Sequence, residues 1–461
     1  MSGRSPGRFC LVLHTHMPYV EGYGTWPFGE EWLWEAMATS YLPLLDVLDA
    51  VPGRATLSLT PVLCDQLEAP GVGERFLAFL RDVRAETHRR DVAAAEDPAL
   101  ARELERSAGL YAAAARRFEA RGGDLVGAFA PHAAWTSAAT HAVLPMLATT
   151  AGVRLQLETG IAAHRRRFGH WHGGLWLPEC GYAPWLDDEL EEAGVHAACV
   201  DLTDVLGYGA PAQLRPLRTG AGPLLVPIDR AIMDLVWHTS GYPSHGAYRN
   251  TRRYTEHRHT PWAVDGAPYD PARAARQVRA DAEHFVAQVA RRIEGGGLCV
   301  CALDTELLGH FWHEGVDWLA AVVEACDAAG VPFAGLDDAL AEGLDSVPAP
   351  SGLPPTSWGE PRDLSTWSGP AAGELAWRAR AAELRVLGGA LAAPPGPRVL
   401  RELLALQASD WAFGVTRGTA GPYPRARADG HAAELERALA NPDGMSPSSR
   451  NLAPSLDLSH P

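Results

Sequence analysis

The stretch Gly174-Leu175-Trp176-Leu177-Pro178-Glu179-Cys180-Gly181-Tyr182 is the first of two that indicate how this chain folds. Its apolar start is typical of a buried strand, which must stop at Pro178 because proline cannot donate a hydrogen bond to a central strand ladder. The second stretch, Leu298-Cys299-Val300-Cys301-Ala302-Leu303-Asp304, repeats the pattern and also ends at a carboxylate. Parallel barrels gather such strand ends at their catalytic face, so Glu179 and Asp304 are expected to meet there.

Each of these two carboxylates also has a purely structural interpretation. Glu179 could be paired with an arginine, and Asp304 could cap a helix that begins at Thr305. Two carboxylates that converge among aromatic side chains, by contrast, carry out the cleavage of glycosidic bonds. The sequence pattern favours the chemical interpretation.

Apolar runs of strand length recur along the chain and alternate with segments of helical periodicity. The predicted strands lie near 9–13, 55–60, 124–129, 174–178, 196–200, 223–228, 298–303 and 331–335. Such alternation indicates parallel βα units. The expected fold class is α/β, with a closed or nearly closed barrel.

The segments outside this alternation divide the chain into four parts. The catalytic barrel is predicted over 1–345. A small helical domain is inserted over 66–122, where apolar residues recur at helical spacing. A helical C-terminal domain is expected over 355–440. The Pro/Ser-rich tail 441–461 is predicted to be disordered.

Composition excludes several classes of function for this chain of 461 residues. Its net charge of −16 argues against binding to nucleic acids or to an anionic membrane surface. All 40 basic residues are arginine, which excludes a Schiff-base lysine and a P-loop lysine. No apolar run has transmembrane length, and the first residues lack the apolar core of a signal peptide. The seven dispersed cysteines fit a reducing compartment, so a cytoplasmic location is expected.

Histidines follow the first and third predicted strands. His14 and His16 are two residues apart, which places both on one face of an extended segment. One interpretation is a metal site completed by His141, His310 or Asp304, and the other is hydrogen bonding to sugar hydroxyls or carboxylates. The segment around His141 is predicted to open a helix.

Together these motifs resemble those of the 1,4-α-glucan branching enzymes of glycoside hydrolase family 57, from about residue 8 to about residue 438. The matching segments are His14 to Val20, Trp26 to Leu33, the His141 segment, Trp176 to Cys180, Asp304 to His310, Ser357 to Glu360 with Trp367, and Leu406 to Trp411. The resemblance implies a (β/α)7 barrel, an incomplete form of the TIM barrel, with a helical insertion and a helical C-terminal domain. It also implies a retaining transferase that cleaves α-1,4 bonds and forms α-1,6 branches, with Glu179 as nucleophile and Asp304 as acid/base.

The resemblance further implies which side chains contact the α-1,4-glucan donor and acceptor chains. His14, His16 and His141 would hold the cleaved glucose, and Tyr242 would belong to a loop that excludes water from the intermediate. The remaining candidates for substrate binding are Trp26, Trp176, His310, Trp312, Trp358, Trp367 and Trp411. Each tryptophan proposed as a stacking platform has core packing as an alternative of equal weight. No metal and no cofactor are expected.

The sequence departs from the family pattern at several positions near these motifs, although none removes a catalytic carboxylate. Gly181 and Ala183 replace an alanine and an arginine, and the other departures are Ile228, Ser244 and Pro361-Arg362. Alternatives within the family are a 4-α-glucanotransferase or an α-amylase-like hydrolase. Outside it, the alternatives are a metal-dependent deacetylase or hydrolase that uses His14 and His16, and a non-catalytic glucan-binding protein.

Overall fold

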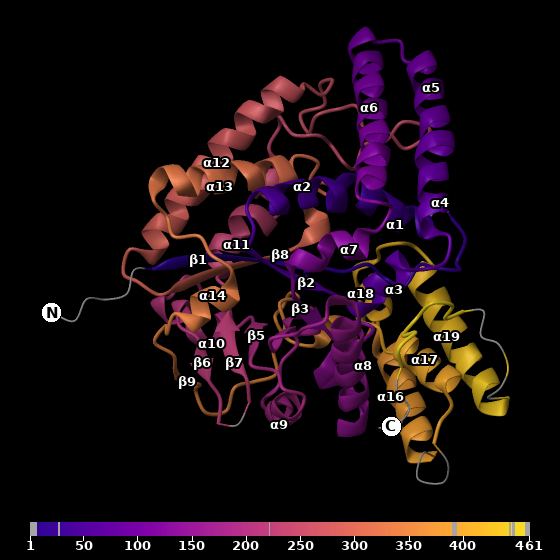
Figure 1. Cartoon of the computed structure of the whole chain (residues 1–461), viewed down its shortest axis with the longest axis vertical. Helices are drawn as coiled ribbons and strands as arrows, with labels where there is room; N and C mark the ends of the chain where they lie inside the picture. The colour runs from indigo at the N-terminus through magenta and orange to yellow at the C-terminus, as the bar shows by residue number, and fades with distance from the viewer. Residues whose placement is uncertain are drawn as a thin grey trace.

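A curled sheet of nine strands forms the centre of the molecule (Figure 1). The computed structural model describes residues 7–25, 28–220, 222–389, 394–441, 444 and 448–456. The strands are β1 (Arg8–Thr15), β2 (Ala55–Leu59), β3 (Ala133–Ser137), β4 (Gly174–Trp176), β5 (Ala197–Val200), β6 (Leu217–Arg218), β7 (Leu224–Pro227), β8 (Leu298–Asp304) and β9 (Val347–Pro348). Their order across the sheet is β8-β1-β2-β3-β4-β5-β7-β6-β9.

Seven neighbouring strands pair in parallel: β8, β1, β2, β3, β4, β5 and β7. Strand β6 pairs antiparallel with β7 and parallel with β9. The sheet also curls back on itself: the Asp229 N–H, just past β7, donates to the Val300 carbonyl of β8 over 2.8 Å. This arrangement confirms the α/β class and the incomplete TIM-like barrel.

Helices cover the outside of the sheet and form the C-terminal part of the chain. They are α1 (Glu30–Ala36), α2 (Leu42–Ala50), α3 (Pro61–Leu67), α4 (Val72–Ala78), α5 (Ala85–Ala94), α6 (Pro98–Ala120), α7 (Leu125–Phe129), α8 (Thr150–Phe168), α9 (Asp187–Glu192), α10 (Thr203–Leu206), α11 (Arg230–Trp237), α12 (Pro271–Ile293), α13 (Gly315–Ala329), α14 (Leu336–Ala341), α15 (Ser365–Ser368), α16 (Gly373–Gly389), α17 (Pro397–Leu406), α18 (Ser409–Arg417) and α19 (Tyr423–Ala440). Two segments are π-helices, η1 (Met37–Tyr41) and η2 (Phe79–Arg84). The short 3-10 helices are η3 (Ala130–His132), η4 (Leu144–Met146), η5 (Pro178–Cys180), η6 (Pro184–Leu186), η7 (Pro211–Leu214), η8 (Tyr242–Ser244) and η9 (Thr305–Leu307). None of these helices is long and apolar enough to cross a membrane in the described part of the chain.

Two groups of helices lie in the regions predicted as separate domains. Helices α5 and α6 project from the body between β2 and β3, and α16, α17 and α19 gather on another side (Figure 1). The C-terminal group has its own apolar cluster, which includes Leu403, Leu404 and Trp411. The domain boundaries themselves stay a prediction.

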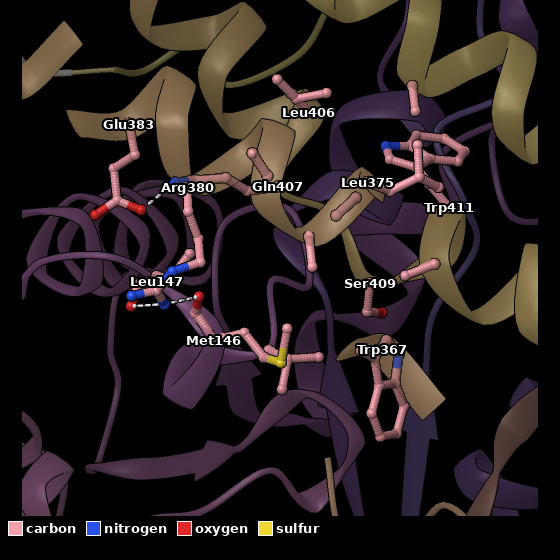
Figure 2. A pocket seen from close by; sticks show the side chains of 16 residues that line it. Met146, Leu147, Trp367, Leu375, Arg380, Glu383, Leu406, Gln407, Ser409 and Trp411 are labelled. Carbon is pink, nitrogen blue, oxygen red and sulfur yellow. Dashed lines mark hydrogen bonds between the residues drawn. The ribbon is translucent and has the colours of Figure 1, made fainter. Parts of the chain in front are cut away.

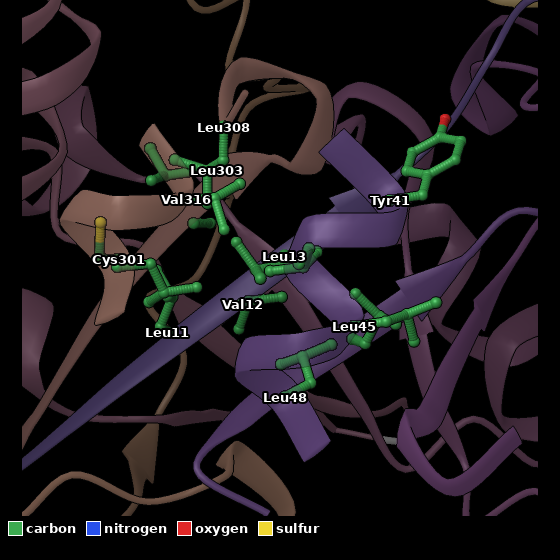
Figure 3. Packing of buried hydrophobic residues seen from close by; sticks show 14 of the residues in the cluster. Leu11, Val12, Leu13, Tyr41, Leu45, Leu48, Cys301, Leu303, Leu308 and Val316 are labelled. Atoms are coloured by element: carbon green, nitrogen blue, oxygen red, sulfur yellow. The ribbon is translucent and has the colours of Figure 1, made fainter. Parts of the chain in front are cut away.

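Strands β1 and β8 supply the centre of the main core. Their apolar runs are buried on both faces of the sheet, as expected of parallel strands covered by helices. Figure 3 shows Leu11 and Leu13 of β1 between Cys301 and Leu303 on one side and Leu45 of α2 on the other. This packing fixes the strand ends where Asp304 lies.

Two predicted strands are wrong. The run 124–129 is helix α7, because the Asp124 side chain accepts a hydrogen bond from the Gly127 N–H and so caps a helix. The strand of this unit, β3, begins nine residues later than expected, at Ala133. In the run 331–335, only Phe333 forms a bridge, with Phe9.

The segment around His141 does not open a helix, which corrects another prediction. His141 has a φ of +59°, in the left-handed region that is costly for a non-glycine residue within a helix. Helix α8 begins only at Thr150, after the Thr149 side chain has accepted a hydrogen bond from the Gly152 N–H.

Part of the predicted disordered tail is packed against the body. Leu452 and Ala453 are buried, and the Ala453 N–H donates to Asp65 over 2.7 Å. Residues 442–443, 445–447 and 457–461 of this tail lie outside the described residues.

Candidate active site

The strand register brings the predicted site residues to one edge of the sheet. Asp304 at the end of β8 pairs with His14 of β1, and His14 pairs with Ser58 of β2. Further along, Trp176 at the end of β4 lies beside Ser137 of β3, three residues before Glu179. The expected meeting of strand ends is therefore present.

Glu179 is held in place through both of its carboxylate oxygens. The Trp358 indole N–H donates to Oε2 over 3.0 Å, and the Ser409 hydroxyl donates to Oε1 over 2.9 Å. The backbone N–H of Trp358 also donates to the backbone carbonyl of Glu179. Glu179 has a φ of +62°, a strained conformation that surrounding contacts must maintain, as is common at active sites. Among the described residues no arginine pairs with it, so the structural interpretation of this carboxylate does not apply.

Glu179 and Asp304 differ in what surrounds them. Burial raises the pKa of Glu179, and the donors Trp358 and Ser409 oppose that rise by stabilising the carboxylate. Burial also raises the pKa of Asp304, well above its usual range, and the negative charges of Glu306 and Glu179 add to the effect. The Asp304 side chain makes no capping hydrogen bond to η9, which removes the helix-cap interpretation. Both carboxyls thus have a raised pKa, but only Glu179 has hydrogen-bond donors that limit the rise by stabilising its charged form.

Three histidines stack beside these carboxyls. The ring centroids of His16 and His141 are 4.0 Å apart, and those of His14 and His141 are 4.9 Å apart. Burial lowers the pKa of His14 and of His141 well below the usual value, and nearby histidines lower both further. For His16 burial also opposes protonation, but the carboxylates of Asp410, Glu306 and Glu179 together outweigh it and raise the pKa. His14 and His141 are therefore neutral near pH 7.

Comparisons with known proteins agree with this geometry. A model described as glycosyl hydrolase family 57 matches residues 134–340, and one described as 1,4-alpha-glucan branching enzyme, C-terminal, matches residues 397–453. A probable 1,4-α-glucan branching enzyme of Mycobacterium tuberculosis is 35% identical, over 97% of this chain and 95% of the relative. The chain belongs to the family 57 branching enzymes. A branching enzyme of Thermococcus kodakarensis is 31% identical, over 94% of this chain and 73% of that protein. The crystal structure of a family 57 branching enzyme of Pyrococcus horikoshii superposes with a TM-score of 0.89, at 29% identity, and covers 98% of this chain and 96% of that chain.

In this family 57 protein, Trp358 is the predicted aromatic residue that reaches the nucleophile candidate. Its ring packs edge-on against Trp176 at 4.9 Å and is nearly parallel to Trp237 at 5.9 Å. Trp237 is 40% exposed, so it offers a face to a ligand next to Glu179. Trp237 was not predicted as a site residue, although its position after an apolar run at the end of α11 was a usable signal.

Four other tryptophans predicted to contact the substrate are buried in the core. Trp176, Trp312, Trp367 and Trp411 are at most 2% exposed and present no free face to a sugar. Trp176 stacks on His14 at 4.7 Å, and so supports the histidines. Trp411 donates to the Ala405 carbonyl within the C-terminal helices. Trp26 lies outside the described residues.

His310 and Tyr242 make their contacts away from the two carboxylates. His310 packs on Phe311, and burial lowers its pKa. The Tyr242 hydroxyl lies 2.7 Å from His284 Nδ1 of α12. The roles predicted for both residues stay predictions.

The structure adds four residues to the site that the sequence interpretation left out. Ser409 and Asp410, at the start of α18, contact Glu179 and His16, and Trp237 stacks on Trp358. Glu306 accepts hydrogen bonds from the Tyr41 hydroxyl and the His16 N–H, and burial raises its pKa to about 7. Ser409 and Asp410 lie inside the matching segment Leu406 to Trp411, and Glu306 lies inside the matching segment Asp304 to His310. Their place in these motifs was a usable signal.

Two of the family departures have local compensation. A Cβ at Gly181 would lie 2.9 Å from the Pro178 carbonyl oxygen and 3.0 Å from Val143, so glycine permits this close approach. Ala183 replaces an arginine, but Arg230 forms an ion pair with Asp201 and donates to the Trp358 carbonyl over 2.9 Å. A buried cation therefore still supports the loop that carries Trp358.

The histidines are engaged by protein groups. His14 Nε2 lies 2.9 Å from His141 Nε2, and His16 Nε2 lies 3.0 Å from Asp410 Oδ1. In the part of the chain that the structure describes, no three His, Cys, Asp or Glu side chains are grouped as a metal site requires. The absence of a metal requirement stays a prediction.

Proposed function

We propose that this chain is a retaining α-glucan branching transferase that cleaves α-1,4 bonds and forms α-1,6 branches. The observation that carries the proposal is the contrast at one sheet edge between Glu179, whose carboxylate has two donors, and Asp304, whose pKa burial raises well above its usual range. A retaining mechanism needs one ionised nucleophile and one protonated acid.

In the proposed reaction, Glu179 attacks the anomeric carbon of the donor glucan and forms a β-glycosyl ester. Asp304 gives its proton to the departing 4-oxygen, and the bond between the two glucose units breaks. Asp304 then takes the proton from the 6-hydroxyl of an acceptor glucan as that oxygen attacks the ester carbon, which restores both carboxyls. We expect the two carboxyl groups to lie about 5–5.5 Å apart, as retention requires.

The surrounding residues support a glucan as the substrate. Trp237 and Trp358 offer an aromatic surface beside Glu179, and aromatic faces pack well on the apolar faces of sugar rings. His14, His16 and His141 are proposed to hold the glucose that undergoes cleavage. The C-terminal helical domain, proposed over 355–440, supplies Ser409 and Asp410 to this centre.

A cytoplasmic location is also proposed. All seven cysteines lie in the described part of the chain, and each is buried as a free thiol. Free thiols of this number are typical of reducing compartments.

Product analysis of Glu179→Gln tests the proposed function. The parent should add α-1,6 linkages to amylose and shift its iodine colour, with little release of reducing ends. The variant should lose all turnover, because an amide is no nucleophile, while its thermal melting stays near that of the parent. Glu189→Gln, at a buried glutamate paired with Arg154, is a matched control that should keep activity.

The outcomes separate the candidate activities. Longer α-1,4 chains without α-1,6 linkages would favour a 4-α-glucanotransferase, and a dominant rise in reducing ends would favour an α-amylase-like hydrolase. A folded Glu179→Gln protein with substantial turnover would refute the nucleophile assignment.

A further inference from the structure

Glu179 Oε1 lies at the end of a continuous line of polar atoms from four different parts of the chain. Ser409 Oγ of α18 is 2.9 Å from Glu179 Oε1 and 2.9 Å from His141 Nδ1. His141 Nε2 is 2.9 Å from His14 Nε2 on β1. His14 Nδ1 is 3.4 Å from Ser58 Oγ on β2, a longer contact that starts the line.

The proton count determines the direction of each bond. An ionised carboxylate can only accept hydrogen bonds, so the Ser409 hydroxyl must donate its single proton to Glu179. Its oxygen must then accept from His141, which requires the proton of that imidazole on Nδ1. A neutral imidazole carries one N–H, so His141 Nε2 accepts from His14 Nε2–H. His14 Nδ1 then carries no proton and lies 3.4 Å from Ser58 Oγ, whose hydroxyl donates to the Thr136 carbonyl.

Burial supports the neutral state that this count assumes. It lowers the pKa of both His14 and His141, and each ring is at most 3% exposed. If both rings were charged, two N–H groups would face each other across the 2.9 Å between the rings.

We propose that Ser409 is a positioning residue for Glu179, and that three hydrogen bonds, from His14 to His141 to Ser409 to Glu179, run in one direction and hold the carboxylate ready for attack. The inference rests on the proposed function, because it takes Glu179 as the nucleophile. It also gives the C-terminal helices a task in the chemistry, since Ser409 comes from α18 and the Ser409 N–H donates to the His141 carbonyl.

Substitutions at Ser409 test the proposal against a merely structural role. Ser409→Ala removes a hydrogen bond to a charged group, so we expect kcat on amylose to fall about 10- to 100-fold with a small change in KM. Ser409→Thr keeps the hydroxyl and should restore activity to within about threefold. Ser409 lines a small pocket together with Met146 and Trp367, so the added methyl group would border this pocket (Figure 2).

Thr416→Ala on the same helix is the matched control. Its hydroxyl donates to the Thr366 carbonyl over 2.7 Å and contacts neither histidine nor Glu179. We expect parental kcat in this variant. A loss of kcat equal to that of Ser409→Ala would reduce Ser409 to an element of helix packing.

The pH dependence of kcat/KM distinguishes the positioning role from a role in packing alone, which would leave this dependence unchanged. The titratable groups that face Glu179 are His141, His16, Asp410 and Asp304, from the loop after β3, the end of β1, α18 and the end of β8. All four remain in Ser409→Ala. Loss of the hydroxyl donor should raise the pKa of Glu179, so the acid limb of kcat/KM should move to higher pH. An unchanged acid limb would overturn the proposal.

Nitrogen-15 NMR of histidine-labelled protein tests the direction of the chain even if Ser409→Ala fails to fold. At a pH where the enzyme is active, His141 should carry its proton on Nδ1 and His14 on Nε2, with assignment through His14→Gln and His141→Gln. The reverse tautomers would overturn the proposal.

Chemical rescue separates failure of this proposal from failure of the proposed function. Azide with Glu179→Ala and α-maltosyl fluoride should give a β-maltosyl azide, as azide attacks the anomeric carbon and fluoride leaves. If rescue succeeds and the Ser409 results are parental, only the positioning role is wrong. If the β-azide does not form, the nucleophile assignment fails first.

Discussion

His16 Nε2 lies 3.0 Å from Asp410 Oδ1, and this contact joins the end of β1 to α18 across 394 residues of the chain. Both side chains are mostly buried, at 11% and 13% exposed. Together with the Ser409 contact to Glu179, it makes the C-terminal helices a wall of the catalytic centre. Loss of these contacts should therefore affect stability and chemistry together.

The first prediction concerns this ion pair. Burial lowers the pKa of His16, but Asp410, with smaller contributions from Glu306 and Glu179, brings the folded value above that of an ordinary histidine. A raised pKa means that the stabilisation is fully present below the unfolded pKa near 6.5 and is lost as pH rises through the folded pKa. Asp410→Asn should lower the free energy of unfolding by roughly 1–3 kcal/mol at pH 6 and by less at pH 9.

Urea denaturation at the two pH values measures this difference. Glu436→Gln is the control, because its pair with Arg385 is exposed and should contribute at most about 1 kcal/mol. An equal loss in Asp410→Asn at pH 6 and pH 9 would contradict the assignment of charge to His16.

The second prediction concerns Asp304 as the proposed general acid. Asp304→Ala should lower turnover of amylose by about 10²–10⁴-fold, the usual contribution of general acid–base catalysis. α-Maltosyl fluoride has a leaving group that needs little protonation, so the first step should be partly spared. Stopped-flow measurement of fluoride release compares the two substrates. Equal losses on both substrates in an unfolded protein would make Asp304 a structural residue.

The third prediction concerns the exposed aromatic surface. Trp237→Ala should raise KM for amylose about 2- to 10-fold with a smaller change in kcat, because it removes a stacking face next to Trp358 and leaves both carboxyls intact. Trp377→Ala on α16 is the control, since this tryptophan is 73% exposed and should leave KM unchanged. A parental KM in Trp237→Ala would exclude this surface as a binding platform.

The fourth prediction concerns whether water or the hydroxyl of an acceptor sugar attacks the proposed glycosyl ester. Tyr242→Ala should lower new α-1,6 linkages and raise reducing ends per bond cleaved, because the loop would shield the ester less well. Tyr242→Phe removes only the hydroxyl bond to His284 and should keep the parental ratio. Linkage analysis and a reducing-end assay on one reaction give that ratio. If Tyr242→Ala also keeps it, the loop does not exclude water.

The fifth prediction is that dialysis against a chelator leaves branching activity unchanged. The Nε2 atoms of His14 and His16 already contact His141 and Asp410, so they are not free to bind a metal without rearrangement. Metal analysis of the dialysed protein accompanies the activity assay. Activity that is lost and then restored by zinc or manganese would favour the deacetylase-like hypothesis.

The chain order of the main strands and the positions of the two carboxylates followed from the sequence. Apolar runs that end at Pro178 and Asp304 are local signals, and a parallel sheet must bring such ends to one edge. One of the two wrong strand predictions, at the residues of α7, arose from an equally local signal: capping by Asp124 outweighs the apolar run that follows.

Only the tertiary structure decided which side chains complete the site. Ser409 is 230 residues from Glu179 in the chain, and no periodicity relates residues at such a separation. For the same reason, the sequence could not tell buried tryptophans from exposed ones, because an indole packs equally well in a core or under a sugar. Only its surroundings make Trp411 a core residue and leave Trp237 exposed. Local composition thus determined the strands and where they end, whereas docking of α18 against those ends determined which side chains hold Glu179.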